Sequence, residues 1–153
     1  MAAPAMSYLI CSIGLVVLIL VLPAFFAMER DRVAEELMVR ELTEISDYTS
    51  NTLENLFLLA NSTTSQQLTI TKELIYLPLT VEGSPYVLKI SSVDSAASRV
   101  TAYLENKPSV AGTSWLVPGL KTSENSLLIR NYTVVAECTR NATGFYAWIG
   151  EGD

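Results

Sequence analysis

Three asparagines begin the tripeptide Asn-X-Ser/Thr, in which X is not proline: Asn61, Asn131 and Asn141. This tripeptide is the acceptor for N-linked glycans, which are attached to the side-chain amide nitrogen. Three copies are a mild excess over what the Asn, Ser and Thr content gives by chance. All three follow the apolar N-terminal part of the chain, so they predict glycosylation at these positions and a C-terminal part that lies outside the cell.

Other chemistry finds little support in the residue content. The chain has no histidine, which removes the usual general base and the usual neutral metal ligand. The two cysteines, Cys11 and Cys138, form no paired motif, and we expect no disulfide between them. No glycine-rich phosphate loop or Gly-X-Ser-X-Gly sequence occurs. We therefore expect no catalytic residues, no metal site and no cofactor, and we expect that the protein is not an enzyme.

The charge of the chain limits its partners. It has 16 acidic and 10 basic residues, which gives a formal net charge of −6. The basic residues are not clustered, so they can neutralise few phosphates, and nucleic acid is excluded as an expected partner. The flank MERDR that follows the apolar segment interleaves two acids with two arginines, so it predicts neither attraction to anionic lipid nor an orientation in the membrane.

The first structural element is the run SYLICSIGLVVLILVLPAFFA, from Ser7 to Ala27, which contains no charged side chain. Its length suits a helix that crosses a hydrocarbon core of about 30 Å. A cleaved secretory signal would have a basic start and a shorter apolar region, and a buried helix would need a larger domain to cover it. We therefore assign residues 1–28 to a transmembrane or assembly helix, in which Pro23 is expected to introduce a kink or a weak point.

Residues 29–64 form the second predicted element, an amphipathic helical stalk. The stretch up to residue 60 lacks Gly and Pro, and its apolar residues recur at steps of three and four. We expect the stripe either to pack on the protein's own β domain or to contact copies of itself or a partner helix. The residues assigned to the assembly helix, from both segments, are Leu15, Leu18, Leu22, Leu42, Ile45, Leu56 and Leu59.

Residues 65–153 form the third predicted element, a β-rich domain outside the cell. From Gln67 the apolar period changes to two, and Gly83-Ser-Pro85 marks a turn. Further strands are predicted in YVLKISS, VTAYLE, SWLVPGL, SLLIRNY with TVVAECT, and FYAWI. We expect the core to contain Trp115, Phe145 and Trp148. The sequence thus predicts an α+β fold, with a long N-terminal helix followed by a small antiparallel β-sandwich-like domain.

This layout resembles that of archaeal type IV pilins and the pilin-like accessory proteins of the archaeal flagellum. The resemblance covers Ser7–Ala27, Glu29–Ala60 and Gln67–Trp148, and it involves no diagnostic motif. It implies that the apolar helix bundles in a filament core while the β domain faces outward. One departure is that MAAPAMSY lacks the basic residue that precedes the cleavage site of class III prepilins, so the subunit is either processed, atypical or resident in the membrane.

Two functions follow as expectations. The first is a structural subunit of a cell-surface filament, which associates with copies of itself through the N-terminal helix. The second is a single-pass anchored protein, such as a stator or envelope-tethering component, whose β domain binds a partner such as a surface layer. Both place the chain in the cell membrane with its C-terminal domain outside, or in an extracellular filament.

Overall fold

The computed structural model describes residues 3–93, 97–130 and 133–152, with side chains described from Met6 onward. One helix precedes all the strands in this part of the chain. The elements are α1 (Ala3–Ser62), β1 (Leu68–Glu73), β2 (Tyr86–Ser92), β3 (Ser98–Leu104), β4 (Ala111–Trp115), β5 (Leu120–Thr122), β6 (Asn125–Leu128), β7 (Val134–Asn141) and β8 (Gly144–Glu151).

Helix α1 continues through Pro23 and ends where the sequence predicts, in the polar stretch after Ala60. The hydroxyls of Ser62 and Thr63 both donate to the carbonyl oxygen of Leu59, at 2.8 and 3.0 Å. These bonds satisfy one of the carbonyls that the last helical turn leaves without an intrahelical partner. The side-chain hydroxyls of this stretch therefore help to terminate the helix.

The chain divides into two compact units, residues 1–37 and residues 38–153. All residues of the first unit that the structure describes, from Ala3 onward, belong to α1. The second contains the remainder of α1 together with the strands. The second half of the predicted stalk therefore belongs to the same compact unit as the β domain.

The strands form two four-stranded sheets, with the orders β1-β7-β8-β5 and β4-β3-β2-β6. All neighbouring strands are antiparallel except β5 and β8, which pair in parallel over the three residues of β5. The β7–β8 pair is the longest hairpin, with Asn141 opposite Gly144 at its turn. The predicted α+β layout, a long apolar N-terminal helix followed by small sheets that are mostly antiparallel, is confirmed.

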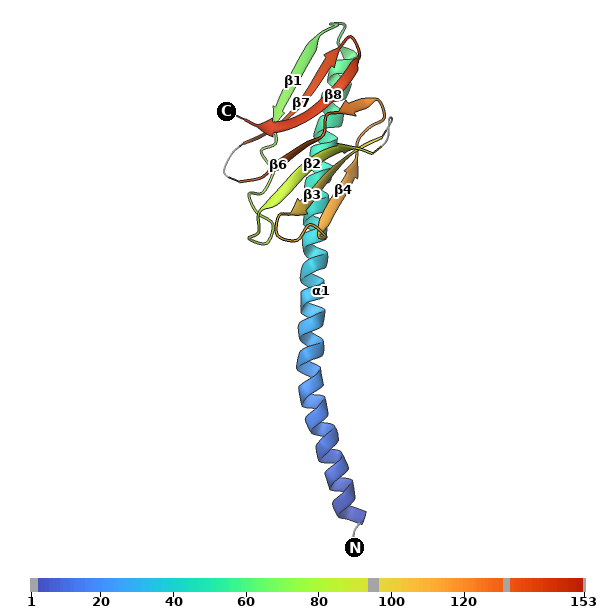
Figure 1. Ribbon diagram of the computed structural model, residues 1–153, viewed down its shortest axis with the longest axis vertical. Helices are drawn as coiled ribbons and strands as arrows, with labels where there is room; N and C mark the ends of the chain where they lie inside the picture. Colours follow the sequence, from blue (N-terminus) through green and yellow to red (C-terminus); the bar gives the residue numbers. More distant parts are fainter. Residues whose placement is uncertain (1–2, 94–96, 131–132, 153) are drawn as a thin grey trace. The chain divides into compact units, whose positions relative to one another are not determined.

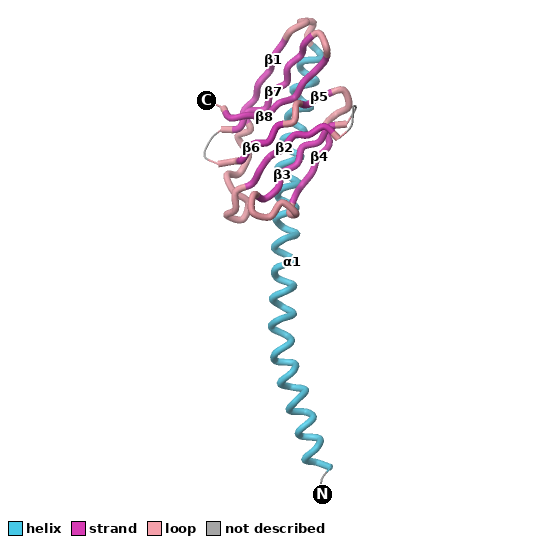
Figure 2. Tube along the Cα trace, in the orientation of Figure 1, coloured by secondary structure: helices cyan, strands magenta, loops and turns pink. Residues whose placement is uncertain are grey.

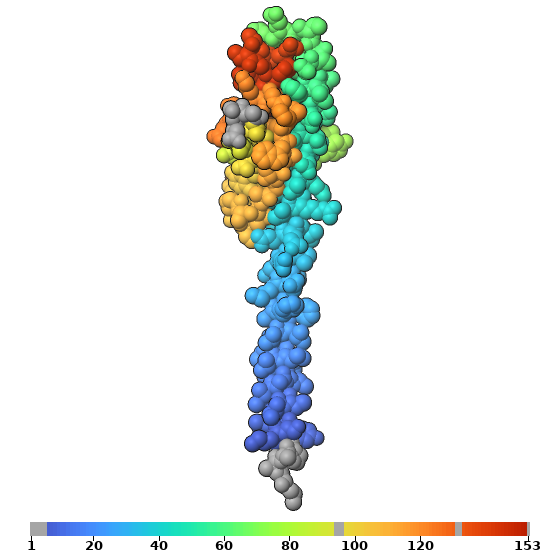
Figure 3. Space-filling model, turned by 90° about the vertical axis from the view of Figure 1, so that its right-hand side faces the viewer, coloured from blue at the N-terminus to red at the C-terminus, as the bar shows by residue number. Residues whose placement is uncertain are grey.

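Within the unit 38–153, both sheets cover one side of the helix (Figures 1 and 2). Figure 3 shows the same packing from the side, with the cyan and green part of α1 beside the orange strands. A single core joins the two layers. Its helical members are Leu42, Ile45, Leu53, Leu56 and Ala60, and its largest fully buried side chains on the strands and loops include Tyr86, Leu88, Ile90, Val100, Ile129 and Ile149.

Two sequence-based expectations for this domain were wrong. Trp115 is 61% exposed and Trp148 is 41% exposed, whereas Phe145 packs against the core as predicted. Trp148 lies between two buried residues, Ala147 and Ile149, and successive side chains of a strand point to opposite faces, so its ring faces outward.

The predicted strand SWLVPGL is also divided. Strand β4 ends at Trp115, and β5 begins only at Leu120 in the other sheet. Pro118 has no backbone N–H to donate to a ladder, and Gly119 has a φ of 95°, which other residues rarely adopt. These two residues turn the chain from one sheet into the next.

Candidate functional site: the exposed apolar helix

The apolar part of α1 is exposed along its length in the part of the chain that the structure describes. Leu15 and Leu18 are each 58% exposed, and Leu22 is 42% exposed. Within the described residues, α1 is the helix that is long and apolar enough to cross a membrane, and none of its most apolar stretch is buried. The apolar N-terminal helix is thus compatible with a membrane anchor by length and composition.

The exposed apolar surface surrounds the helix on all sides. Consecutive helical residues are separated by 100°, so a run of apolar residues longer than one turn leaves no polar face. Such a run extends without interruption from Leu15 to Leu22. Burying each of these side chains is worth roughly 1.5–3 kcal/mol, so this stretch favours any apolar environment over water.

A mixed-charge segment follows the apolar stretch in the same unit. Arg32 Nε lies 3.3 Å from an oxygen of Glu36, as an exposed i, i+4 pair. Glu29, Arg30 and Asp31 are also exposed. Positions 29–32 carry two acidic and two basic residues, so the charge directly after the apolar stretch is balanced, and Glu35 and Glu36 follow as two further acids.

The residues assigned to the assembly helix fall into two groups. Leu42, Ile45 and Leu56 are only 0–4% exposed, because they form the core with both sheets. The prediction that the stripe packs on the protein's own β domain is therefore confirmed for this segment. Leu59 is 56% exposed and, like Leu15, Leu18 and Leu22, is not part of the described core.

Polar residues that the sequence reasoning missed hold the second half of α1 in place. Ser46 and Ser50, one turn apart, donate their hydroxyls to carbonyl oxygens of β4, those of Gly112 at 3.0 Å and Trp115 at 2.7 Å. Both serines are buried. Ser46 and Ser50 directly follow Ile45 and Thr49 of the apolar stripe. This position beside the stripe was the sequence signal that the two serines could be buried.

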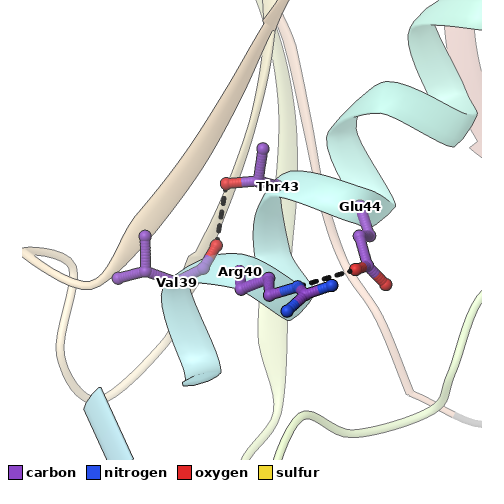
Figure 4. Close-up of polar contacts among 4 residues, drawn as sticks. All are labelled: Val39, Arg40, Thr43 and Glu44. Atoms are coloured by element: carbon purple, nitrogen blue, oxygen red, sulfur yellow. Dashed lines mark hydrogen bonds and ion pairs between the residues drawn. The ribbon is translucent and has the colours of Figure 1, made fainter. Parts of the chain in front are cut away.

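Local contacts also join side chains of this segment to one another and to its backbone (Figure 4). The Thr43 hydroxyl donates to the carbonyl oxygen of Val39 at 2.8 Å, and Arg40 Nε donates to Glu44 at 3.3 Å. The Arg40–Glu44 pair is exposed, and exposed ion pairs contribute little to stability. The buried face of the segment therefore determines how the helix packs in this unit.

Two of the three predicted glycosylation residues can be placed. Asn61 is exposed in the last turn of α1, and Asn141 is exposed at the β7–β8 turn. Arg140 connects the two regions, because its guanidinium donates to the carbonyl oxygens of Ala60 at 3.3 Å and Thr63 at 2.6 Å. Asn131 lies outside the described residues.

Burial raises the pKa of two groups of the domain, the Tyr86 phenol and the Cys138 thiol. Burial, with the charge of Glu41 as a second cause, raises the pKa of the Tyr86 phenol, whose hydroxyl donates to the carbonyl oxygen of Pro78 at 2.7 Å. Both cysteines are free thiols, Cys11 exposed and Cys138 buried. In the ranges that the structure describes, no three His, Cys, Asp or Glu residues are grouped as metal ligands.

Comparison with protein-family models, with characterised proteins and with solved structures finds no match to this chain. The chain's own surface is therefore the guide to its function. Its most distinctive feature is an apolar helical segment with every side exposed, in a unit separate from a folded domain whose core is complete without it.

Proposed function

We propose that this protein is a structural subunit of a cell-surface filament of the type IV pilin kind, which assembles through its N-terminal helix and exposes its β domain. The observation that carries the proposal is the exposure of Leu15, Leu18 and Leu22 together with the apolar residues between them. Such a helix requires lipid before assembly and the same helix of neighbouring copies afterwards. The chain would enter the membrane once, with its C-terminal domain outside.

The buried stripe limits where copies can contact one another. Leu42, Ile45 and Leu56 are already used by the chain's own core, so they are not available to a neighbour. Contacts between copies would then involve the unit 1–37, where positions 29–32 carry two acids and two bases. The β domain would keep its outer faces for solvent, which agrees with the exposure of Asn61 and Asn141.

The test is to compare Leu18→Lys with Leu58→Lys in cells that express the full chain. Both leucines lie on α1 with similar exposure, 58% and 54%, but only Leu18 lies in the apolar segment. A lysine in the middle of a membrane helix costs about 3 kcal/mol. We expect Leu18→Lys to abolish recovery of the protein in sheared filaments and to deplete it from the membrane fraction, while Leu58→Lys behaves as the unchanged chain.

The second candidate is a single-pass anchored binding or tethering protein, such as a stator that binds a surface layer. This candidate is favoured by the apolar side chains on every side of the helix, because lipid surrounds a single membrane-spanning helix completely. This alternative predicts that the unchanged chain remains in the membrane fraction after shearing and cross-links to no second copy. Recovery of the chain in filaments would reject it.

A further inference from the structure

The two sequons that the structure describes have different conformations. Asn61 is helical, within the last turn of α1, and Asn141 is the last residue of β7 at a tight hairpin turn. Glycan acceptors in folded proteins belong to surface loops, because the transferase must reach the asparagine and the hydroxyl residue two positions later together. The conformation of each tripeptide therefore determines how well the folded chain can present it.

The sequon at Asn61 is held in an unsuitable conformation. Asn61 lies in the last turn of α1, and Thr63 directly follows the end of that helix. The Thr63 hydroxyl donates to the carbonyl oxygen of Leu59 at 3.0 Å. Arg140 then fixes the backbone on both sides of Asn61 by donating to the Ala60 and Thr63 carbonyls. A transferase would have to break these bonds before it could bind the tripeptide.

The sequon at Asn141 already has its two functional side chains together. The Thr143 hydroxyl donates to the side-chain oxygen of Asn141 at 2.7 Å, and the Thr143 backbone N–H donates to the same oxygen at 3.0 Å. Asparagine at the first position of a turn and glycine at the fourth are typical of this geometry, and Gly144 has a φ of 136°. The hydroxyl of Tyr146 lies 3.0 Å from that of Thr143 and extends the polar contacts.

The surroundings of Asn141 also leave space for a sugar. Asn141, Ala142 and Thr143 are all exposed. Asn141 and Ala142 line a surface hollow together with Gln66, Gln67 and Arg140. These side chains offer amide and guanidinium groups that can hydrogen-bond to sugar hydroxyls. Figure 3 shows this end of the domain, with the red end of the chain beside the green end of α1.

We infer that, of the two sequons in the described residues, Asn141 is the preferred N-glycan acceptor of the folded chain, and that Asn61 is disfavoured because the helix end and Arg140 hold the backbone of its tripeptide in place. The donor is an oligosaccharide linked to a lipid through phosphate. The amide nitrogen of Asn141 forms a bond to the anomeric carbon, the bond from that carbon to the phosphate oxygen breaks, and the nitrogen loses a proton to a base of the transferase. In the cell this step depends on the outside location given under the proposed function.

The experiment uses the purified full chain in detergent, a purified oligosaccharyltransferase and its lipid-linked oligosaccharide. Glycopeptide mass spectrometry follows modification at Asn61 and Asn141 over time. We expect modification at Asn61 to be roughly tenfold slower than at Asn141. This factor corresponds to a free-energy cost of about 1.4 kcal/mol for releasing the Asn61 tripeptide from its hydrogen bonds. Short synthetic peptides that contain each tripeptide should be modified at similar rates, because neither keeps the folded conformation.

Matched variants separate conformation from sequence. Thr143→Ala should abolish modification at Asn141, and Thr143→Ser should retain it. Arg140→Gln should increase the rate at Asn61 severalfold, because it removes the charged donor from the Ala60 and Thr63 carbonyls. Equal rates at Asn61 and Asn141 on the folded chain, or the same tenfold preference between the free peptides, would overturn the inference.

The assay does not depend on membrane placement or filament assembly. Suppose that the chain isolated from cells carries no glycans but the purified reaction prefers Asn141 over Asn61. This result would contradict the outside location, and the preference of the folded chain for Asn141 would stand. Loss of selectivity in the purified reaction, combined with filaments in cells, would contradict only the inference about Asn141.

Discussion

The Ser46 hydroxyl lies between β3 and β4, where it donates to the carbonyl oxygen of Gly112 at 3.0 Å and accepts from the backbone N–H of Ala102 at 3.1 Å. Ala102 and Gly112 are paired residues of these two strands. A helical side chain therefore bridges a sheet ladder directly, and it does so at a position with 0% exposure. This contact fixes the second half of α1 against the sheet in both position and rotation.

Replacing Ser46 with alanine should destabilise the unit 38–153 by about 2 kcal/mol. The substitution removes two buried hydrogen bonds and leaves the groups of Ala102 and Gly112 without this partner, and a buried polar group without a partner costs about 1–3 kcal/mol. Denaturant unfolding followed by circular dichroism measures the change. Ser126→Ala, at an exposed position of β6, is the matched control and should change the free energy of unfolding by less than about 0.5 kcal/mol.

Replacing Gly112 with alanine should cost about 3 kcal/mol. A Cβ added at this position would lie 2.1 Å from the backbone nitrogen of Thr43, and backbone atoms cannot move aside as a flexible side chain can. The helix and β4 would have to separate, which is an overpacking cost. Thr113→Ala, the exposed neighbour on the same strand, is the control. A Gly112→Ala chain with unchanged stability would contradict the close approach of α1 and β4.

The sequence predicted the broad elements because their signals are local. The change of apolar period after Gln67, the strand YVLKISS and the turn at Gly83 all appear where the sequence indicated. The sequence did not predict the contact between Ser46 and Gly112, because it joins residues 66 positions apart. A serine on a helix is ordinarily read as solvent-exposed, and only the approach of β4 makes this one a bridge.

The sequence predicted the exposed apolar part of the candidate site but did not predict which apolar residues of α1 the β domain buries. Leu15 and Leu18 are exposed because no other described element of their unit packs against them. The high hydropathy of their segment was the sequence signal for a membrane or assembly helix. Leu42 and Leu56 have the same residue type and lie on the same helix, yet the β domain covers them. Periodicity identifies an apolar face but does not say whether the chain itself or another molecule buries it.

The stability of the unit should fall as pH rises from about 8.5 to 11. Burial, with the neighbouring Glu137 carboxylate as a second cause, raises the pKa of the Cys138 thiol to about 11. The unfolded thiol releases its proton near pH 8.5, so in this window the unfolded state binds fewer protons and becomes favoured. The contribution is fully present below pH 8.5 and is lost through pH 11, with a total of about 3 kcal/mol.

Cys138→Ala isolates this effect from the other groups that titrate in alkali. The difference in free energy of unfolding between the unchanged chain and the variant should decrease by about 3 kcal/mol between pH 8 and pH 11, measured under reducing conditions. A difference that stays constant over this range would show that the folded and unfolded thiols titrate alike.

Leu42→Ala should lower the stability of the domain, whereas Leu18→Ala should weaken association between copies, although both remove the same atoms from the same helix. Leu42 is 0% exposed in the core, so its truncation should destabilise the unit 38–153 by about 3 kcal/mol, through lost burial and the cavity left behind. Leu18 touches no core, so its truncation should leave that unfolding transition unchanged within about 0.5 kcal/mol. It should instead weaken association between copies, measured by cross-linking at Cys11 in detergent or in filaments. If Leu18→Ala unfolded the domain while cross-linking persisted, it would contradict the assignment of association to the first part of α1 and of core packing to the second.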